Sequence, residues 1–373
     1  MKFICLQENL KKGLAVVSHI NNKNINLPIL NNILIRANES GLELVSTNLE
    51  IGITHQLRAK VEETGETTVD AKIISDYVNL LPSEKVELKE DKDDIGLKCG
   101  NYKTKIKGES AKEFPLIPQI DKNRFAEFNV FDFKKALAGV AFAVANNDNR
   151  LELSGVLFEF NEENLTLVAT DSYRLSEKKI GVKGGNINEG RVIVPARTVQ
   201  EVLRIISGLS ADAQTIESDK LKVYLADNQI MFAFDTVELI SRLISGQYPD
   251  YKQIIPDKYK TEVVIKRQDF IRALKASSIF SRVGVFDISL VFKKGLINVF
   301  SSSSQNGESS IDLSGDLTGD DNDITINYRY LLDGLNIIES DTVNIKVINN
   351  NTPCALCAEG DDEYLYIVMP IRN

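Results

Sequence analysis

The sequence predicts an α+β protein built from three tandem copies of one domain. Three stretches with similar apolar spacing begin near Phe3, Phe128 and Val263. Their apolar positions fall into step when Leu10 is aligned with Phe133 and Phe270, at spacings of 123 and 137 residues. A period of this length is the size of a whole domain and far exceeds a solenoid repeat. The chain of 373 residues is long enough for three such domains.

Two further segments repeat with the same rhythm. The sequence LVSTN at 44–48 recurs as LVATD at 167–171, again 123 residues later, with a weaker echo at 299–303. The third repeated segment begins at Thr67, Arg191 and Ile324. Three segments that recur in the same order indicate that whole domains are repeated, not single motifs.

Within each copy, the pattern predicts a helix, strands, a second helix and more strands. In the first copy, apolar residues from Leu6 to Val17 recur at three- and four-residue spacing, which gives one apolar helix face. Alternating segments at 42–57 and 165–176 are typical of strands with one buried face. We expect the second helices over 71–81, 199–209 and 330–338, and further strands over 85–91, 221–235, 343–350 and 363–372. This order predicts helices on one face of a largely antiparallel sheet.

Proline-containing segments mark the domain ends. Pro115 and Pro118 follow the last strand of the first copy, and the segment from Pro249 to Pro256 follows that of the second. Proline after a strand is typical of a linker leaving a domain edge. The predicted domains are therefore 1–121, 122–257 and 258–373.

Composition favours an ordinary cytosolic protein. The chain is 43% hydrophobic and 26% charged, so each copy can bury a core. No apolar run approaches the roughly 20 residues that span a bilayer, and the N-terminus shows no signal-peptide pattern. We expect a cytoplasmic location.

Motifs for catalysis and for metal binding are weak. The sequence contains no Walker A, GxGxxG, HExxH or GxSxG motif. Cys354 and Cys357 form a lone CxxC in an extended segment, where positions three apart point to opposite faces. His19, late in the first helix, and His55, in a strand, are expected to be structural or solvent-facing. We therefore predict no catalytic residue, no metal and no cofactor.

Acidic clusters leave one rival interpretation open. A metal-dependent enzyme on a repeated α+β scaffold would need these side chains to converge, whereas turn positions between strands favour solvated acids. The clusters are Asp91, Asp93 and Asp94; Asp316, Asp320, Asp321 and Asp323; and Asp361, Asp362 and Glu363.

Positive charge is concentrated on the predicted helices. The net charge of −9 and the pI of about 5.1 argue against coating nucleic acid by bulk charge. For any single helix, basic residues are most simply a solvated face. If the equivalent helices of every copy line one surface, however, they form a basic lining that attracts phosphates without reading sequence. Few aromatic residues interrupt these helices, which favours duplex over single-stranded nucleic acid. The residues are Lys11, Lys12, Lys72, Lys134, Lys135, Arg197, Arg204, Arg267, Arg272, Lys275 and Arg329.

The whole chain resembles the bacterial DNA polymerase III beta subunit, the sliding clamp. Seven motifs occurring in order on the threefold repeat carry the resemblance. They are MKF at 1–3, LPILNN at 27–32, TNLEI at 47–51, EFP at 113–115, ATDSYRL at 169–175, YPDY at 248–251 and VMPIR at 368–372.

The resemblance implies a ring. Two copies would close head to tail in the DNA clamp fold, with helices lining a central hole that holds duplex DNA. Such a ring is not an enzyme: it tethers the replicative polymerase by topology and thereby confers processivity. A specialised clamp that serves repair, plasmid or resistance partners stays open as an alternative.

The resemblance also implies an apolar pocket between the second and third domains. There the polymerase, the clamp loader and repair proteins would insert a short linear peptide. Leu, Ile, Val, Met and Pro suit such an anchor site, and Arg174 and Arg372 could bond the peptide. The matching residues are Leu153, Thr170, Ser172, Tyr173, Arg174, Leu175, Pro249, Ile254, Ile367, Val368, Met369, Pro370, Ile371 and Arg372.

Two further surfaces follow from the resemblance. DNA-facing loops would add Lys23, Asn24, Asn147 and Arg150, and the dimer would form between Tyr102, Thr104 and Ile106 of one edge strand and Ile279 and Phe280 of the third domain. Several positions depart from the family pattern: Ser172 and Tyr173 stand where many members carry Gly and His, Asn24 replaces a basic residue, Leu151 and Glu152 replace aromatic residues, and Asn373 replaces an apolar one.

Overall fold

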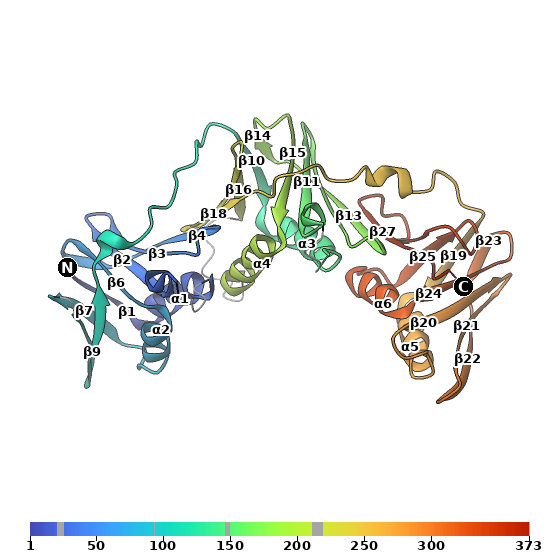
Figure 1. Ribbon diagram of the computed structural model, residues 1–373, viewed down its shortest axis with the longest axis horizontal. Helices are drawn as coiled ribbons and strands as arrows, with labels where there is room; N and C mark the ends of the chain where they lie inside the picture. Colours follow the sequence, from blue (N-terminus) through green and yellow to red (C-terminus); the bar gives the residue numbers. More distant parts are fainter. Residues whose placement is uncertain (21–25, 93, 146–149, 211–218, 373) are drawn as a thin grey trace. The chain divides into compact units, whose positions relative to one another are not determined.

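Each third of the chain has the same element order in the computed structural model, which describes residues 1–20, 26–92, 94–145, 150–210 and 219–372 (Figure 1). Within the described residues, every repeat contains nine strands and two helices, in the order strand, helix, five strands, helix, three strands. The predicted threefold α+β repeat is confirmed.

The first repeat carries the N-terminal elements. They are β1 (Lys2–Leu6), α1 (Gln7–Val17), β2 (Asn32–Asn38), β3 (Gly41–Thr47), β4 (Ile51–Leu57), β5 (Lys60–Glu63), β6 (Gly65–Asp70), α2 (Ala71–Asn79), β7 (Lys85–Asp91), β8 (Asp94–Cys99) and β9 (Tyr102–Glu109). Short 3-10 turns lie at η1 (Ser18–Ile20), η2 (Pro28–Asn31) and η3 (Ala111–Glu113).

The second and third repeats follow the same plan. The second has β10 (Phe125–Asn129), α3 (Val130–Ala141), β11 (Gly155–Asn161), β12 (Asn164–Thr170), β13 (Arg174–Gly181), β14 (Gly184–Gly185), β15 (Glu189–Pro195), α4 (Ala196–Ser210), β16 (Lys220–Leu225), β17 (Gln229–Phe234) and β18 (Val237–Arg242), with turns η4 (Leu151–Leu153) and η5 (Tyr251–Ile254). The third has β19 (Thr261–Lys266), α5 (Arg267–Ser278), β20 (Asp287–Lys293), β21 (Leu296–Ser303), β22 (Gly307–Leu313), β23 (Asp316–Gly319), β24 (Asn322–Asn327), α6 (Tyr328–Ile337), β25 (Thr342–Val347), β26 (Cys354–Ala358) and β27 (Tyr364–Val368).

One prediction about the elements was wrong: each repeat begins with a strand and not with a helix. In β1, Phe3 and Cys5 are buried while Lys2 and Ile4 are only partly covered, and this period of two is that of a strand. Strand β1 pairs antiparallel with β7, placing Phe3 opposite Leu88. The apolar residues of the strand run into those of the helix without a break, which hid the boundary in the sequence.

The helical alignment of the repeats is confirmed by burial. Leu10, Phe133 and Phe270, which the repeat places in register, are all completely buried.

Each second helix begins directly after a strand. The Asp70 side chain caps α2 by accepting from the Ile73 N–H at 2.8 Å, and Asn327 caps α6 in the same way through Arg329.

The contacts group the chain into two compact units. The first comprises Met1–Lys134, Val182–Ile187 and Arg197–Leu243, and the second comprises Lys135–Gly181, Asn188–Ala196 and Ile244–Asn373. The first unit contains a sheet in the order β14-β10-β16-β17-β18-β4-β3-β2-β6-β9-β8-β7-β1-β5. The second contains the sheets β15-β11-β12-β13-β27-β26-β25-β19-β23 and β22-β21-β20-β24.

Each large sheet joins two repeats through one antiparallel strand pair. At the first junction β18 pairs with β4, placing Ile240 opposite Gly52. At the second junction β27 pairs with β13, placing Ile367 opposite Leu175. In both cases the ninth strand of one repeat pairs with the fourth strand of the repeat before it (Figure 1).

Candidate functional site

The turn between β12 and β13 forms one wall of the candidate partner site. The Thr170 hydroxyl donates to the Arg174 carbonyl at 2.6 Å and accepts from the Ser172 N–H at 3.1 Å. Asp171 Oδ1 accepts from the N–H groups of Tyr173 and Arg174, both at 3.0 Å. These bonds hold Ser172 at a φ of +77° and leave the Tyr173 side chain 63% exposed.

The C-terminal segment lies against this turn. The Met369 N–H donates to the Tyr173 carbonyl at 2.8 Å, which continues the β13–β27 ladder by one bond. Beyond it, Pro370 forms a bridge with Ile326, and the Ile371 N–H donates to the Thr325 carbonyl at 2.8 Å. The structure therefore brings together two candidate segments that are almost 200 residues apart in the sequence.

Beneath the turn and the C-terminal segment lies one apolar cluster. Leu153 of η4, Leu175 of β13 and Ile367 of β27 are all buried in it, together with Tyr248 and Tyr251 from the segment after β18. Among the candidates, Thr170 and Val368 are also buried, Arg174, Pro249, Met369, Pro370 and Ile371 are half-buried, and Ser172, Tyr173, Ile254 and Arg372 are exposed. Leu153, Leu175 and Ile367 thus form a buried apolar floor, and Ser172 and Tyr173 of the adjoining turn are exposed.

Arg174 is held inside the protein. Its Nε donates to Asp171 at 3.0 Å, Nη1 to Asp333, and Nη2 to the Phe142 carbonyl at 2.9 Å. The guanidinium also lies over the Tyr330 ring, 4.7 Å from the centroid, and its side chain is only 12% exposed. This arrangement fits a residue that positions the turn better than one that reaches out to a peptide.

Tyr330 and Asp333 were missed by the sequence reasoning. Both lie on α6, and the Tyr330 ring stacks on that of Tyr173 with centroids 6.5 Å apart. No local motif marks them, because their role arises only when α6 and the turn come together in the fold. They extend the candidate site to the second helix of the third repeat.

Three of the basic candidates donate hydrogen bonds to backbone carbonyls of the protein itself. Arg204 of α4 donates to the carbonyls of Ala15 and Val16 near the C-terminal end of α1, at 2.9 and 2.7 Å. Arg267 donates to the carbonyls of Leu335 and Ser340, both at 3.0 Å, and Arg197 to that of Ile20 at 3.4 Å. Guanidinium groups at helix C-termini satisfy carbonyls that lack a partner in the helix.

The other basic candidates lie nearer the surface. Lys11 and Lys275 are exposed and Lys134 is half-buried, and within the described part of the chain these three form no ion pair. Lys72, Lys135 and Arg272 are exposed but pair with Asp76, Glu339 and Asp269. Arg150 donates to Glu152 at 3.4 Å and to the Ser172 hydroxyl at 3.2 Å, and Arg329 lies over the Phe286 ring. Lys12 is half-buried, and Lys23, Asn24 and Asn147 lie outside the described residues.

The candidate dimer residues lie on an open sheet edge and at a helix end. Residues 102–107 of β9 pair with β8 on one side, whereas β6 pairs only with Gly108 and Glu109. Along β9, Tyr102 is exposed, Thr104 is half-buried and Ile106 is buried. Ile279 directly follows α5 and is 66% exposed, and Phe280 beside it is half-buried.

Cys354 and Cys357 lie in β26 as predicted, Cys354 is fully buried, and burial raises its pKa to about 12. Within the described ranges, no group of three His, Cys, Asp or Glu side chains is arranged to hold a metal ion. No described helix has the length and apolar character needed to cross a membrane.

Comparison with known proteins identifies the family. Three family models match the chain in order: the N-terminal domain of the DNA polymerase III beta subunit over residues 1–118, the central domain over 127–250 and the C-terminal domain over 252–372. The chain belongs to the DNA polymerase III beta subunit family. This family is the sliding clamp, a non-catalytic processivity subunit of the polymerase.

Individual relatives agree along the whole chain. The beta sliding clamp of Synechocystis is 26% identical over 394 residues, covering 100% of this chain and 99% of the relative. A crystal structure described as a DNA polymerase III beta subunit of Eubacterium rectale is 30% identical, with a TM-score of 0.91 and coverage of 100% and 99%. The Pseudomonas aeruginosa sliding clamp, solved bound to griselimycin, is 25% identical with a TM-score of 0.94 and full coverage of both chains.

Proposed function

We propose that two copies of this chain close head to tail into a ring around duplex DNA. The ring tethers the replicative polymerase and other proteins that carry short clamp-binding peptides, and so confers processivity in the bacterial cytoplasm. The observation that carries this proposal is the ordered match of all three beta subunit domains on a threefold repeated fold. We place the domain limits at 121/122 and 257/258.

The strand pairing within the chain indicates how the ring closes. At both junctions, the ninth strand of one repeat pairs with the fourth strand of the preceding repeat. Applying this rule once more leaves β9, the ninth strand of the first repeat, and β22, the fourth strand of the third. Strand β22 is the edge of its four-stranded sheet, and residues 102–107 of β9 form an open edge. Pairing them between two protomers removes both exposed edges.

The helices follow a matching rule. At the first junction α1 contacts α4 through Arg204, and at the second Lys135 of α3 donates to Glu339, which lies just after α6. The first helix of one repeat thus meets the second helix of the next, which leaves α2 and α5 for the interface between protomers. Both carry exposed apolar residues there: Ile73 and Leu80 on α2 and after it, Ile279 and Val283 after α5. Burying these side chains between two protomers would remove their apolar surface from water.

The oligomeric state tests this interface. We expect a mass of twice the 41.6 kDa chain in light scattering, and a shift to the monomer when Ile279 is replaced by Asp. Leu116→Asp is the matched control because Leu116 is 92% exposed and lies outside the proposed interface. A monomeric wild-type protein, or an Ile279→Asp variant as dimeric as the control, would contradict the proposed interface between the protomers.

Contact with DNA is expected to come from exposed lysine and arginine side chains. Among the residues that the structure describes, Lys11 of α1 and Lys275 of α5 form no ion pair. Lys72 and Arg272 form only weak surface ion pairs with Asp76 and Asp269, and a DNA phosphate can replace these carboxylates. Such contacts are sequence-independent and weaken with salt, which suits a ring that slides. An acidic net charge keeps the remaining surface from holding DNA.

Topological retention tests the ring function directly. The protein is loaded onto nicked circular DNA with a clamp loader and ATP, isolated by gel filtration, and the DNA is then cut once. We expect retention on the circle and release after linearisation. Equal retention before and after the cut would show ordinary charge binding and contradict the sliding clamp.

A further inference from the structure

The first junction repeats the geometry of the proposed peptide pocket. The Thr47 hydroxyl donates to the Ile51 carbonyl at 2.9 Å and accepts from the Leu49 N–H at 3.0 Å. Leu49 has a φ of +73°, close to the +77° of Ser172 in the second junction. The Arg242 N–H donates to the Glu50 carbonyl at 3.0 Å, as Met369 does to Tyr173. Turn, ladder and terminal bond are therefore the same at both junctions.

The segments that follow the last strands of the first and second repeats, β9 and β18, also correspond to each other. We call residues 114–120 the strap. Phe114 is buried against Leu34 and Val45. In the second junction, Tyr248 packs in one cluster with Leu157 and Val168, which are the repeat equivalents of those two residues. A proline follows the aromatic residue in both cases.

The two junctions differ in the floor beneath the turn. Gly52 opposes Ile240 where Leu175 opposes Ile367, so the floor of the first junction lacks a side chain. A Cβ atom on Gly52 would lie 3.0 Å from Cδ1 and 3.1 Å from Cγ2 of Ile117, a residue of the strap. Ile117 therefore occupies the space that the glycine leaves. It also packs against both apolar clusters under the strap, the one around Phe114 and the one around Met231 and Ile240.

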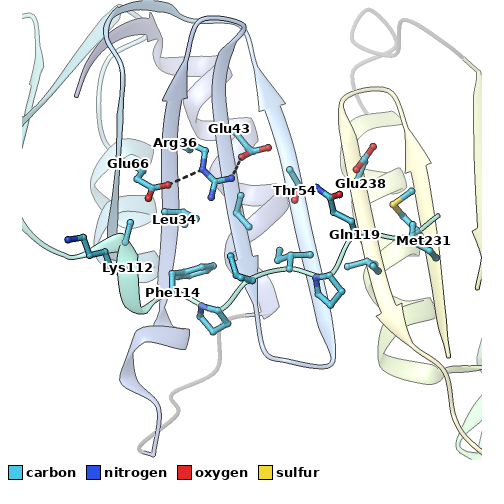
Figure 2. Close-up of a pocket in the computed structure, with 18 of the residues that line it drawn as sticks. Leu34, Arg36, Glu43, Thr54, Glu66, Lys112, Phe114, Gln119, Met231 and Glu238 are labelled. Atoms are coloured by element: carbon cyan, nitrogen blue, oxygen red, sulfur yellow. Dashed lines mark hydrogen bonds and ion pairs between the residues drawn. The ribbon is translucent and has the colours of Figure 1, made fainter. Parts of the chain in front are cut away.

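The strap lines two cavities. Figure 2 shows the strap crossing the sheet below Arg36, with Phe114 toward one end and Gln119 toward the other. One cavity of about 790 Å³ and a second of about 90 Å³ share Ile240 and the strap residues 115–118 in their linings. The larger volume is in the range of pockets that hold small ligands.

Of the six charged side chains that line the larger cavity, five pair with one another, and Lys112 is the sixth. Arg36 pairs with Glu43 at 2.6 Å and with Glu66 at 3.1 Å, and Lys122 pairs with Glu238 at 2.5 Å. A charged ligand would have to break these pairs, whereas an apolar side chain on an uncharged peptide would not. Two apolar residues, Leu49 and Leu116, are exposed beside the smaller cavity, 46% and 92% respectively.

We propose that the first junction is a second groove for short linear peptides with an apolar anchor, and that Ile117 of the strap occupies its anchor position as an intramolecular ligand. The strap thus keeps partner binding to one junction per protomer. This inference rests on the proposed function of the second junction, because the peptide class is taken from there.

Peptide stoichiometry tests the inference. A fluorescent Gln-Leu-x-Leu-Phe peptide is titrated into the full-length wild type, Ile117→Ala and the matched control Leu116→Ala, with calorimetry giving the number of sites. We expect one site per protomer in the wild type and in Leu116→Ala, and twice that number in Ile117→Ala. Folding of each variant is checked by its thermal transition.

A second background separates this inference from the proposed function. Deleting residues 369–373 is expected to remove the site at the second junction. Adding Ile117→Ala to this deletion should restore saturable binding at the first junction. An unchanged number of sites in Ile117→Ala, with no restored binding in the deletion background, would overturn the intramolecular ligand. Absence of binding to the wild type would instead count against the pocket at the second junction.

Discussion

The N–H of Met369 donates a hydrogen bond to the carbonyl oxygen of Tyr173, with the two atoms 2.8 Å apart. This bond fixes the C-terminal segment of the third repeat to a turn of the second. The rim residue Tyr173 and the half-buried Met369 thereby stand over a floor made by Leu175 and Ile367. The candidate pocket is thus a consequence of strand pairing between repeats.

Arg204 is expected to matter for stability and not for DNA binding. Its guanidinium bonds two carbonyls of α1 and Glu201, which is buried. Replacing Arg204 by Met removes the donor from both carbonyls and leaves Glu201 with its bond to His19, so we expect a loss of roughly 2 kcal/mol in the free energy of unfolding. Urea denaturation measures this loss, and Lys11→Met, on an exposed face, should change stability by less than about 0.5 kcal/mol. DNA retention, by contrast, should be reduced more by Lys11→Met than by Arg204→Met. Equal stability of the two variants would show that Arg204 is only a surface charge.

His55 is expected to make stability depend on acidity. Burial lowers the pKa of His55 from 6.5 to about 4. The folded state therefore keeps the ring neutral while the unfolded state takes up a proton as pH falls below 6.5. Stability from this group is fully present above pH 6.5 and is lost between pH 6.5 and 4, by an amount on the order of 3 kcal/mol.

Unfolding curves at a series of pH values check this expectation. The slope of stability against pH between 6.5 and 4.5 should be smaller in His55→Gln than in the wild type, because the titrating group is gone. Identical slopes in the two proteins would mean that His55 titrates alike in the folded and unfolded states.

Ser172 holds a backbone conformation that favours glycine. Its φ of +77° lies in the left-handed region, where a side chain costs on the order of 1 kcal/mol. We expect Ser172→Gly to stabilise the protein by up to about 1 kcal/mol, whereas Ser172→Ala keeps the strain and gains nothing. Thermal unfolding of both variants measures the difference. A glycine variant less stable than the alanine variant would show that the turn is not strained.

Repetition made much of the fold predictable from sequence. Leu10, Phe133 and Phe270 could be placed in register because helix cores demand the same apolar spacing in each copy, and burial confirms the alignment. The strand before each helix was missed, because Phe3 and Cys5 continue the apolar pattern of the helix without a turn residue between them.

Long-range partners could not be predicted in this way. The sequence shows that Arg204 and Arg267 are basic, but only the fold reveals that their guanidinium groups meet backbone carbonyls. The filling of the space over Gly52 by Ile117 is similar: a missing side chain in one strand is compensated by a residue more than sixty positions away. Neither relationship leaves a pattern at fixed spacing.

The most direct test of the partner pocket is a fluorescence-polarisation titration with a labelled Gln-Leu-x-Leu-Phe peptide. The intact chain is compared with a variant lacking residues 369–373, and light scattering is recorded for both. We expect saturable binding to the intact chain, loss of binding on deletion, and a dimeric mass in both cases. No binding to a folded, dimeric intact chain, or full binding to the deletion variant, would contradict a partner pocket formed by the turn and the C-terminal segment.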